Sequence, residues 1–273
     1  MTPSASGSAY LEWSSNAFSP ASTLSTLANP SLKLICMVHG PRPLPRSAPF
    51  APDIILTANV KYSPFSMRQR RGYLRDAKER DLSMHLETAL RGVVISDRWP
   101  KSGLEVAVTI LEGEEDYSWR DECENSRNTE PTSAGQWSVM SVLSGCITVA
   151  SAAIADARID CVDVVAGGFA ALVRNRFDPD QKQKASDMLT LVLDPTPLEC
   201  HEILAACVVG YLPSRDEITA LWVRGELGSS VGDGASREMY LYEDLTNNAI
   251  QAAIGSHRVL TVAVKEAAEL KLR

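Results

Sequence analysis

The chain has 273 residues, of which 45% are apolar and 22% are charged, so it can bury a full core like an ordinary globular protein. Its net charge of −7 argues against tight nucleic-acid binding by the chain alone, because phosphate contacts need clustered lysine and arginine. No uninterrupted apolar run is long enough to predict a membrane span, and the small polar residues 1–8 do not resemble a secretory signal, which favours an intracellular protein.

Six cysteines are scattered along the chain, and no two have the Cys-x-x-Cys spacing of zinc sites and redox motifs. Cys36, Cys146 and Cys207 lie inside apolar runs, where a free cysteine behaves as a small hydrophobic residue. We therefore expect reduced structural thiols, and neither a metal site nor a cofactor.

The first half of the chain combines predicted strands with one helix. Apolar and β-branched runs bounded by proline and glycine predict strands at 31–39 and 53–62. Leucine and alanine recur at helical spacing over about 75–95, with charged residues on the other side, and predict a helix. At 104–111, apolar residues alternate with others as they do in a half-buried strand.

The second half begins with an almost wholly small and apolar segment at 137–158, which favours a helix packed between two layers. Further strands are predicted at 162–173, 188–194, 203–212 and 218–226. A long helical pattern without proline runs from about 236 to 271, with a break near Gly255. This order predicts an α+β protein in which mixed β-sheets sandwich helices, with the segment 137–158 in the centre.

Two segments have the composition of loop insertions in what we expect to be a single domain over residues 1–273. Residues 14–30 are rich in serine, alanine and proline. Residues 112–136 carry a dense run of aspartate and glutamate, and like charges at this density resist burial. The spacing of these acids fits no calcium-binding loop, so a solvated loop is predicted.

Four short blocks stand out along the chain. Gly-Ser-Ala-Tyr-Leu-Glu begins at Gly7 and is followed by Gly-Pro-Arg at 40–42, and Glu-Arg-Asp-Leu begins at Glu79. Ala-Asp-Ala at 155–157 precedes Asp-Val-Val, and Leu-Asp-Pro-Thr stands at 193–196. In this order the blocks resemble the ribonuclease PH family over almost the whole chain. The resemblance implies a ribonuclease PH-like fold, of the class typified by domain 2 of ribosomal protein S5.

Active members of this family need groups for phosphate and for proton transfer. They bind phosphate through a Gly-Thr-Arg motif at the start of the central helix, and they carry acidic residues after the Leu-Asp strand. By the resemblance, the phosphate motif corresponds here to Ser141, Val142 and Leu143, and the two aspartates correspond to Cys200 and Ala206. Valine and leucine cannot bind an anion, and alanine cannot protonate a leaving group. The resemblance therefore implies no catalytic and no metal-binding residue.

Basic residues precede the first predicted helix. Four arginines of this segment are the candidate RNA-binding residues: Arg68, Arg70, Arg71 and Arg75. In related rings the loop before this helix lies near RNA, so the resemblance implies that they hold the RNA backbone without reading bases. The alternative is a solvated helix start whose charge is balanced by Asp76, Glu79 and Asp81. Arg42 and Arg46 are weaker candidates, separated by prolines in an extended segment.

The opening block is close to that of one subunit of the eukaryotic RNA exosome ring. The resemblance thus implies a non-catalytic structural subunit that supports 3′-to-5′ RNA processing and degradation in the nucleus, nucleolus and cytoplasm. Its implied partners are other ribonuclease PH-like exosome subunits, in a heterodimer within a hexameric ring, together with cap subunits and single-stranded RNA, and no membrane. An active phosphate-dependent 3′-to-5′ exoribonuclease is the alternative, and a free-standing binding module is a third reading. Family members usually have another strand before the first block, so the neighbouring sheet edge here is expected to need a partner.

Overall fold

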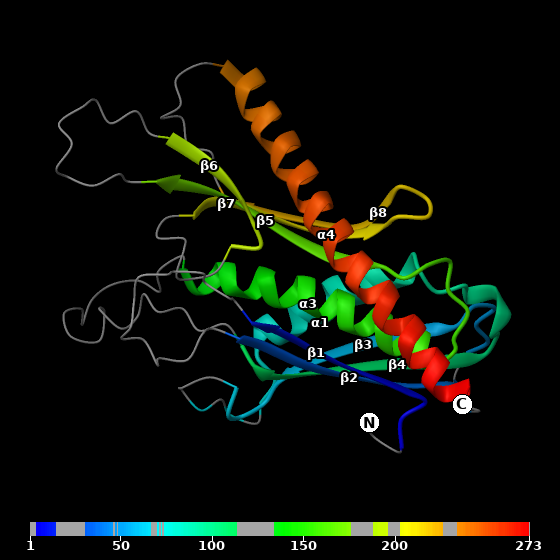
Figure 1. Cartoon of the computed structure of the whole chain (residues 1–273). Coiled ribbons are helices and arrows are strands. Elements are labelled where there is room, and N and C mark those ends of the chain that lie inside the picture. The colour runs from blue at the N-terminus through cyan, green and yellow to red at the C-terminus, as the bar shows by residue number, and fades with distance from the viewer. Residues whose placement is uncertain are drawn as a thin grey trace, which may run out of the picture.

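The protein is described from a computed structural model. The described residues are 4–14, 31–45, 47, 49–66, 70, 72, 74–113, 134–175, 188–195, 203–225 and 234–272. The two predicted loop insertions therefore fall almost entirely outside them. Within the described part, Figure 1 shows two β-sheets, with helices between them and one long helix across the second sheet.

The first sheet is built from β1 (Gly7–Ser14), β2 (Ser31–Pro43), β3 (Ile55–Tyr62) and β4 (Ser102–Glu112). Its order is β1-β2-β4-β3, and β3 and β4 are its parallel pair. Side chains along β2, β3 and β4 alternate between the core and the opposite face, as a strand with one buried face requires. Helix α1 (Ala77–Arg91) packs against β3, and a short 3-10 helix, η1 (Ser96–Arg98), follows it.

The second sheet is antiparallel throughout and has the order β6-β5-β7-β8. Its strands are β5 (Ala166–Asn175), β6 (Met188–Leu193), β7 (Ile203–Leu212) and β8 (Glu217–Gly225). The central strand β7 is buried on both faces from Ala205 onward, which explains its continuous apolar sequence. The edge strand β8 is largely exposed.

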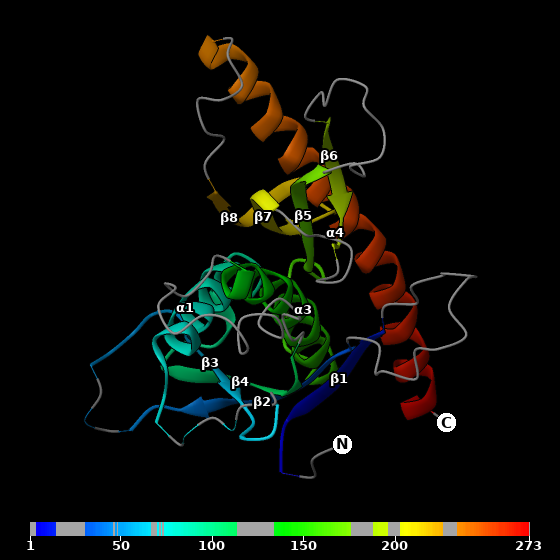
Figure 2. The same ribbon diagram turned by 90° about the vertical axis from the view of Figure 1, so that its left-hand side faces the viewer.

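Helix α3 (Ala134–Asp156) lies between the two sheets, as its apolar sequence predicts (Figure 2). By length and composition its segment Trp137–Asp156 could cross a membrane, but 83% of it is buried inside this protein. Helix α4 (Gly234–Leu272) covers the outer face of the second sheet. The layers are therefore sheet, helices α1 and α3, sheet, and α4, which agrees with the predicted sandwich.

Two neighbouring glycines of β5 let the helices approach the second sheet from both sides. A Cβ atom at Gly167 would collide with the backbone oxygen of Ser144 in α3. A Cβ atom at Gly168 would collide with the backbone of Ala249 and Ala253 in α4. Each of these close contacts with a helix backbone is possible only because the strand residue has no side chain.

Helix α4 corrects one expectation. The predicted break near Gly255 is wrong, because the helix continues through this residue. A glycine inside a helix costs about 1 kcal/mol relative to alanine, but it still donates its backbone hydrogen bond. The packing of α4 against β5, β6, β7 and α3 more than offsets the cost of this glycine, so the helix stays continuous.

The two aspartates of the third sequence block join distant parts of the chain. Asp156 accepts from the backbone N–H of Ser8 at 3.1 Å and pairs with Lys271, so it links the first strand to the end of α4. Asp163 accepts from the backbone N–H of Ser214 at 3.2 Å, and it lies 3.9 Å from Nε2 of His257. These contacts connect the first and second halves of the fold.

Candidate nucleic-acid interface

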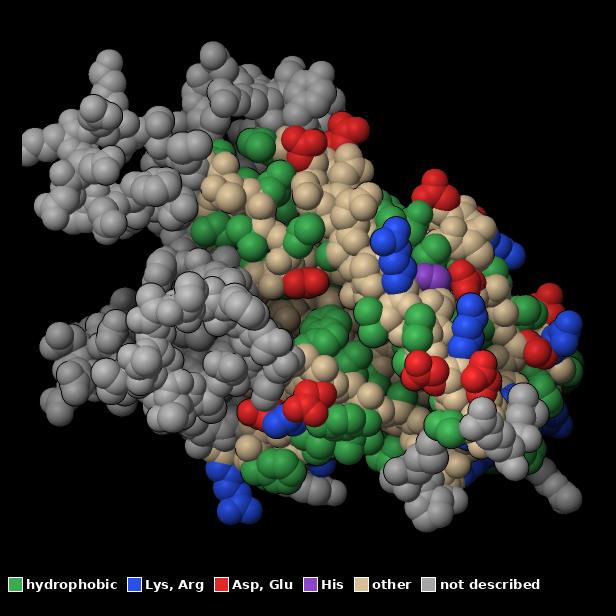
Figure 3. Space-filling view, viewed as in Figure 1, with side chains coloured by type: hydrophobic (Ala, Val, Ile, Leu, Met, Phe, Trp, Pro, Cys, Tyr) green, Lys and Arg blue, Asp and Glu red, His purple; other side chains and the backbone are tan. Residues whose placement is uncertain are grey.

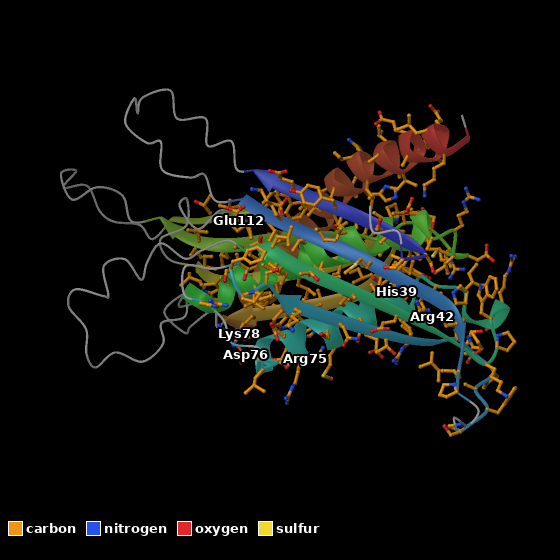
Figure 4. All side chains as sticks on the ribbon, turned by 90° about the horizontal axis from the view of Figure 1, so that it is seen from below. His39, Arg42, Arg75, Asp76, Lys78 and Glu112 are labelled. Carbon is orange, nitrogen blue, oxygen red and sulfur yellow. The ribbon has the colours of Figure 1, made fainter. Side chains whose placement is uncertain are left out.

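The arginine-bearing segment connects the end of β3 to the start of α1. Arg70 and Arg75 are exposed, whereas the predicted site residues Arg68 and Arg71 lie outside the described residues. Figure 4 shows Arg75 beside Asp76 and Lys78 at one end of the molecule, near the end of β4. The structure thus shows that two of the four candidate arginines are exposed.

A capping box fixes the start of α1. The side chain of Asp76 accepts from the backbone N–H of Ala77 at 2.7 Å. In return, Oε2 of Glu79 accepts from the backbone N–H of Asp76 at 3.1 Å. This reciprocal arrangement satisfies backbone donors that a helix start otherwise leaves unpaired.

Glu79 also reaches the edge of the first sheet. Its side chain is only 4% exposed, and its Oε1 accepts from the backbone N–H of Tyr62 at 2.9 Å. A buried carboxylate that accepts two backbone N–H groups ties the end of β3 to the first turn of α1. Glu79 therefore does not belong to the surface charge that could balance the arginines in a solvated helix start.

Ser83, one turn further along α1, makes the second tie to β3. Its Oγ accepts from the backbone N–H of Val60 at 2.9 Å and from a guanidinium N–H of Arg75 at 2.6 Å. The hydroxyl donates in turn to the backbone oxygen of Glu79 at 2.7 Å. Arg75 is thereby held against α1 by a buried serine.

Other exposed groups lie near the arginines in the sequence. Lys78 and Arg80 lie on the exposed side of α1. Phe65 and Leu74, which flank the arginine segment, are 74% and 89% exposed. An aromatic ring beside basic groups is the combination that binds a single strand by stacking and phosphate contacts. The charge pattern alone did not indicate Phe65, although an aromatic residue beside a basic run is a usable signal.

The weaker candidate Arg42 lies elsewhere. Its guanidinium is 3.4 Å from Nδ1 of His39, and Figure 4 shows both residues toward the opposite end of the first sheet from Arg75. Arg46 lies outside the described residues. Arg42 and Arg75 therefore do not form one site.

The positions matched to the phosphate motif of active relatives lie within the core. Val142 and Leu143 in α3 are each 1% exposed, and Ser141 is 5% exposed. Ala206 in β7, matched to one acidic position, is fully buried, and Cys200 lies outside the described residues. Among the described residues, no three His, Cys, Asp or Glu side chains are grouped so that they could hold a metal ion.

The cysteines within the described part are free thiols: Cys36, Cys146, Cys161 and Cys207. Burial raises the pKa of the Cys36 and Cys146 thiols well above the usual range. Burial also raises the pKa of Cys161 and of Cys207 to about 11. The thiolate is the reactive form of cysteine, so these four side chains are chemically inert packing groups at neutral pH.

Comparison with known proteins places this arrangement in a family. A family model described as the 3′ exoribonuclease family (RNase PH), domain 1, matches residues 1–160. The chain is 50% identical over 267 residues to the exosome complex component MTR3 of Chaetomium thermophilum, a match that covers 97% of this chain and 82% of that protein. It is 27% identical over 199 residues to the mtr3 component of Schizosaccharomyces pombe, covering 73% of this chain and 64% of that protein.

Two further matches agree with these. The human exosome complex component MTR3 is 27% identical over 208 residues, which cover 72% of this chain and 63% of that protein. The crystal structure of rice Rrp46 matches with a TM-score of 0.56 at 12% identity, covering 86% of this chain and 84% of that one. This structural likeness confirms the predicted fold. The chain belongs to the ribonuclease PH family of 3′ exoribonucleases and their relatives.

Proposed function

We propose that this chain is a structural subunit of an RNA exosome ring, which supports 3′-to-5′ RNA processing and degradation without catalysing it. The 50% identity to an exosome complex component over 97% of the chain carries this proposal. In such a ring the chain pairs with another ribonuclease PH-like subunit, meets cap subunits, and works in the nucleus, nucleolus and cytoplasm.

The non-catalytic part of the proposal is supported by the residue types at the matched positions. Val142 and Leu143 are buried apolar side chains, and Ala206 has no group that can transfer a proton. A site for phosphorolysis needs exposed donors for the phosphate and an acid for the leaving oxygen. The family's description as exoribonucleases favours an active enzyme as the alternative.

The RNA-contacting part rests on exposed arginines in the segment before α1. Arg70 and Arg75 are exposed, and Phe65 lies nearby in sequence. We propose that these arginines, together with Arg68 and Arg71, contact RNA phosphates in the central channel. The face in Figure 3 is the one that α4 crosses, away from α1, and on it acidic and basic side chains are interspersed.

The proposal also treats residues 1–273 as one domain. One buried cluster contains side chains from both sheets and from the helices between them, such as Leu34, Leu143 and Val208. A shared core of this kind favours cooperative folding of both sheets.

Co-expression with each ribonuclease PH-like exosome subunit of the same organism tests the ring assignment. We expect one of them to form a stable heterodimer with the chain in size-exclusion chromatography, because obligate interfaces bury upwards of ~2,000 Å² in total. The chain expressed alone is the control. A chain that stays monomeric and well folded with every such partner contradicts the proposal.

A further inference from the structure

Arg75 differs from three surface arginines of the described part in the chemistry of its anchor. Its guanidinium donates to the neutral hydroxyl of Ser83 at 2.6 Å. By contrast, three arginines on the surface pair with a carboxylate: Arg91 with Glu87, Arg98 with Asp160, and Arg215 with Glu217. A carboxylate neutralises a guanidinium and competes with any anionic ligand, whereas a hydroxyl orients the side chain and leaves its positive charge intact.

Ser83 is suited to hold this arginine in one place. A hydroxyl has one donor and two acceptor positions, and all three are used here. The donor bonds the backbone oxygen of Glu79, and the acceptors bond Val60 and Arg75. Because Ser83 is only 5% exposed, these bonds are shielded from water and fix the direction of the hydroxyl.

The remaining geometry points Arg75 toward a ligand in solvent. The hydrogen bond to Ser83 occupies one of its five N–H groups, and the residue is exposed. A planar guanidinium with its other donors in solvent matches the two oxygens of a phosphate. Exposed Asp76 and Lys78 lie beside Arg75 and carry opposite charges (Figure 4).

We propose that Ser83 is a positioning residue that holds Arg75 for the backbone phosphate of single-stranded RNA. This inference rests on the proposed function, because RNA reaches the chain within the assembled ring. The shared ligand chemistry is a phosphate group, and free inorganic phosphate is the other source of it. Arg75 binds the phosphate, and Ser83 acts through Arg75 alone.

The test is RNA binding by the assembled ring across a salt series from 50 to 200 mM, with a fluorescent poly(A) strand. Arg75→Ala should lower the slope of log affinity against log salt concentration by roughly 0.7, the value for one phosphate contact on a single strand. Over this range of salt, the variant ring should therefore lose about 2.6-fold less affinity than the wild-type ring does. Ser83→Ala should reproduce most of this change although Arg75 is still present. Ser83→Thr, which keeps the hydroxyl, should restore the wild-type slope.

The double variant shows whether Ser83 acts through Arg75. With both residues changed to alanine, the slope should equal that of Arg75→Ala alone, because coupled effects are not additive. Arg91→Ala removes the same charge from the far end of α1 and should leave the slope unchanged. Ser83→Ala also leaves the N–H of Val60 without a partner, so that subunit can fail to fold. Arg75→Ala leaves that bond in place and keeps the inference testable.

Each failure has its own signature. A chain that does not enter the ring overturns the proposed function and removes the basis of the inference. If the Arg75→Ala ring assembles and binds RNA with the wild-type salt slope, the inference about Arg75 and Ser83 is overturned and the proposed function is unaffected. Phosphate binding measured without RNA separates the two phosphate sources. If inorganic phosphate binds wild-type rings but not Arg75→Ala rings, while the RNA salt slope is the same in both, Arg75 serves free phosphate, and the RNA assignment is overturned.

Discussion

A single residue, Glu79, illustrates how burial changes the role of a charge. In the sequence it is one of three acids that could balance neighbouring arginines on a solvated helix. In the structure it is buried and accepts from the backbone N–H groups of Tyr62 and Asp76. The Asp-x-x-Glu spacing predicts the capping half of this role, but the contact with β3 depends on packing between distant segments.

His85 is a second residue whose environment is set by tertiary packing. Its ring stacks on that of Trp222 in β8, with the ring centroids 4.3 Å apart. Partial burial lowers the pKa of His85, and the nearby carboxylate of Asp81 opposes that shift only in part. The folded state therefore binds a proton at His85 less readily than the unfolded state does.

This lowered pKa predicts a pH-dependent stability. Below the ordinary histidine pKa of about 6.5, the unfolded chain binds a proton that the folded chain resists, so stability falls as pH falls from about 7 to 5. Above about pH 7.5, His85 is neutral in both states and contributes no pH dependence. His85→Phe keeps a ring against Trp222 and removes the titrating group.

Chemical unfolding followed by tryptophan fluorescence at pH 5, 6, 7, 7.5 and 8 measures the effect. The free energy of unfolding of His85→Phe relative to wild type should rise as pH falls, and it should be constant between pH 7.5 and 8. Because other groups titrate identically in both proteins, only this difference is diagnostic. A difference that does not vary with pH shows that His85 is not the group responsible.

At the scale of the element, the contacts of each helix decide what a glycine means. Gly167 stands where α3 meets β5, and a side chain there would collide with the backbone of Ser144. Gly255 stands on the exposed side of α4, with no atom near the position of a Cβ. The first glycine allows two layers to pack, whereas the second only weakens its own helix.

Exchanging each glycine for alanine should therefore have opposite effects. Gly167→Ala should destabilise the protein by about 1–3 kcal/mol, because overpacking forces the layers apart. Gly255→Ala should stabilise it by about 0.5–1 kcal/mol, since alanine is the better helix former. Thermal and chemical unfolding of the two variants and the wild type give both values. Equal effects of the two substitutions rule out the close approach of α3 to β5 as the reason for Gly167.

At the scale of the whole molecule, the layered fold places the matched phosphate motif inside the core. Helix α3 lies between two sheets, so the side chains of Val142 and Leu143 are enclosed by the core on both sides. Two polar side chains of this helix are used within the fold, where Thr148 and Ser151 accept from the backbone N–H groups of Gly167 and Val165.

The purified chain should accordingly release no nucleoside diphosphates from single-stranded RNA, with or without inorganic phosphate and Mg²⁺. Product analysis by chromatography measures this, and an active ribonuclease PH is the positive control. Phosphate-dependent release by homogeneous protein, lost in Glu199→Ala or Glu202→Ala, contradicts the proposal. These two acids lie within the stretch 198–206 that is matched to the acidic motif, so their loss separates genuine activity from contamination.

Most of the fold could be predicted from local pattern. Strands at 203–212 and 188–194 and the helix at 137–158 agree with β7, β6 and α3 to within a few residues. The expected strand at 162–173 begins only at Ala166, after a bend at residues 162 and 163. The candidate site was less predictable, since Arg68 and Arg71 lie outside the described residues and the role of Ser83 depends on β3.

The sequence by itself determined the α+β class, the apolar central helix and the family, because apolar periodicity and short blocks are local properties of the chain. Only the tertiary structure decided that Glu79 is buried, that Ser83 joins Val60 to Arg75, and that α4 continues through Gly255. Each of these depends on segments far apart in sequence coming within hydrogen-bonding or packing distance. Side-chain burial and hydrogen-bond partners follow from that packing, which residue spacing alone does not encode.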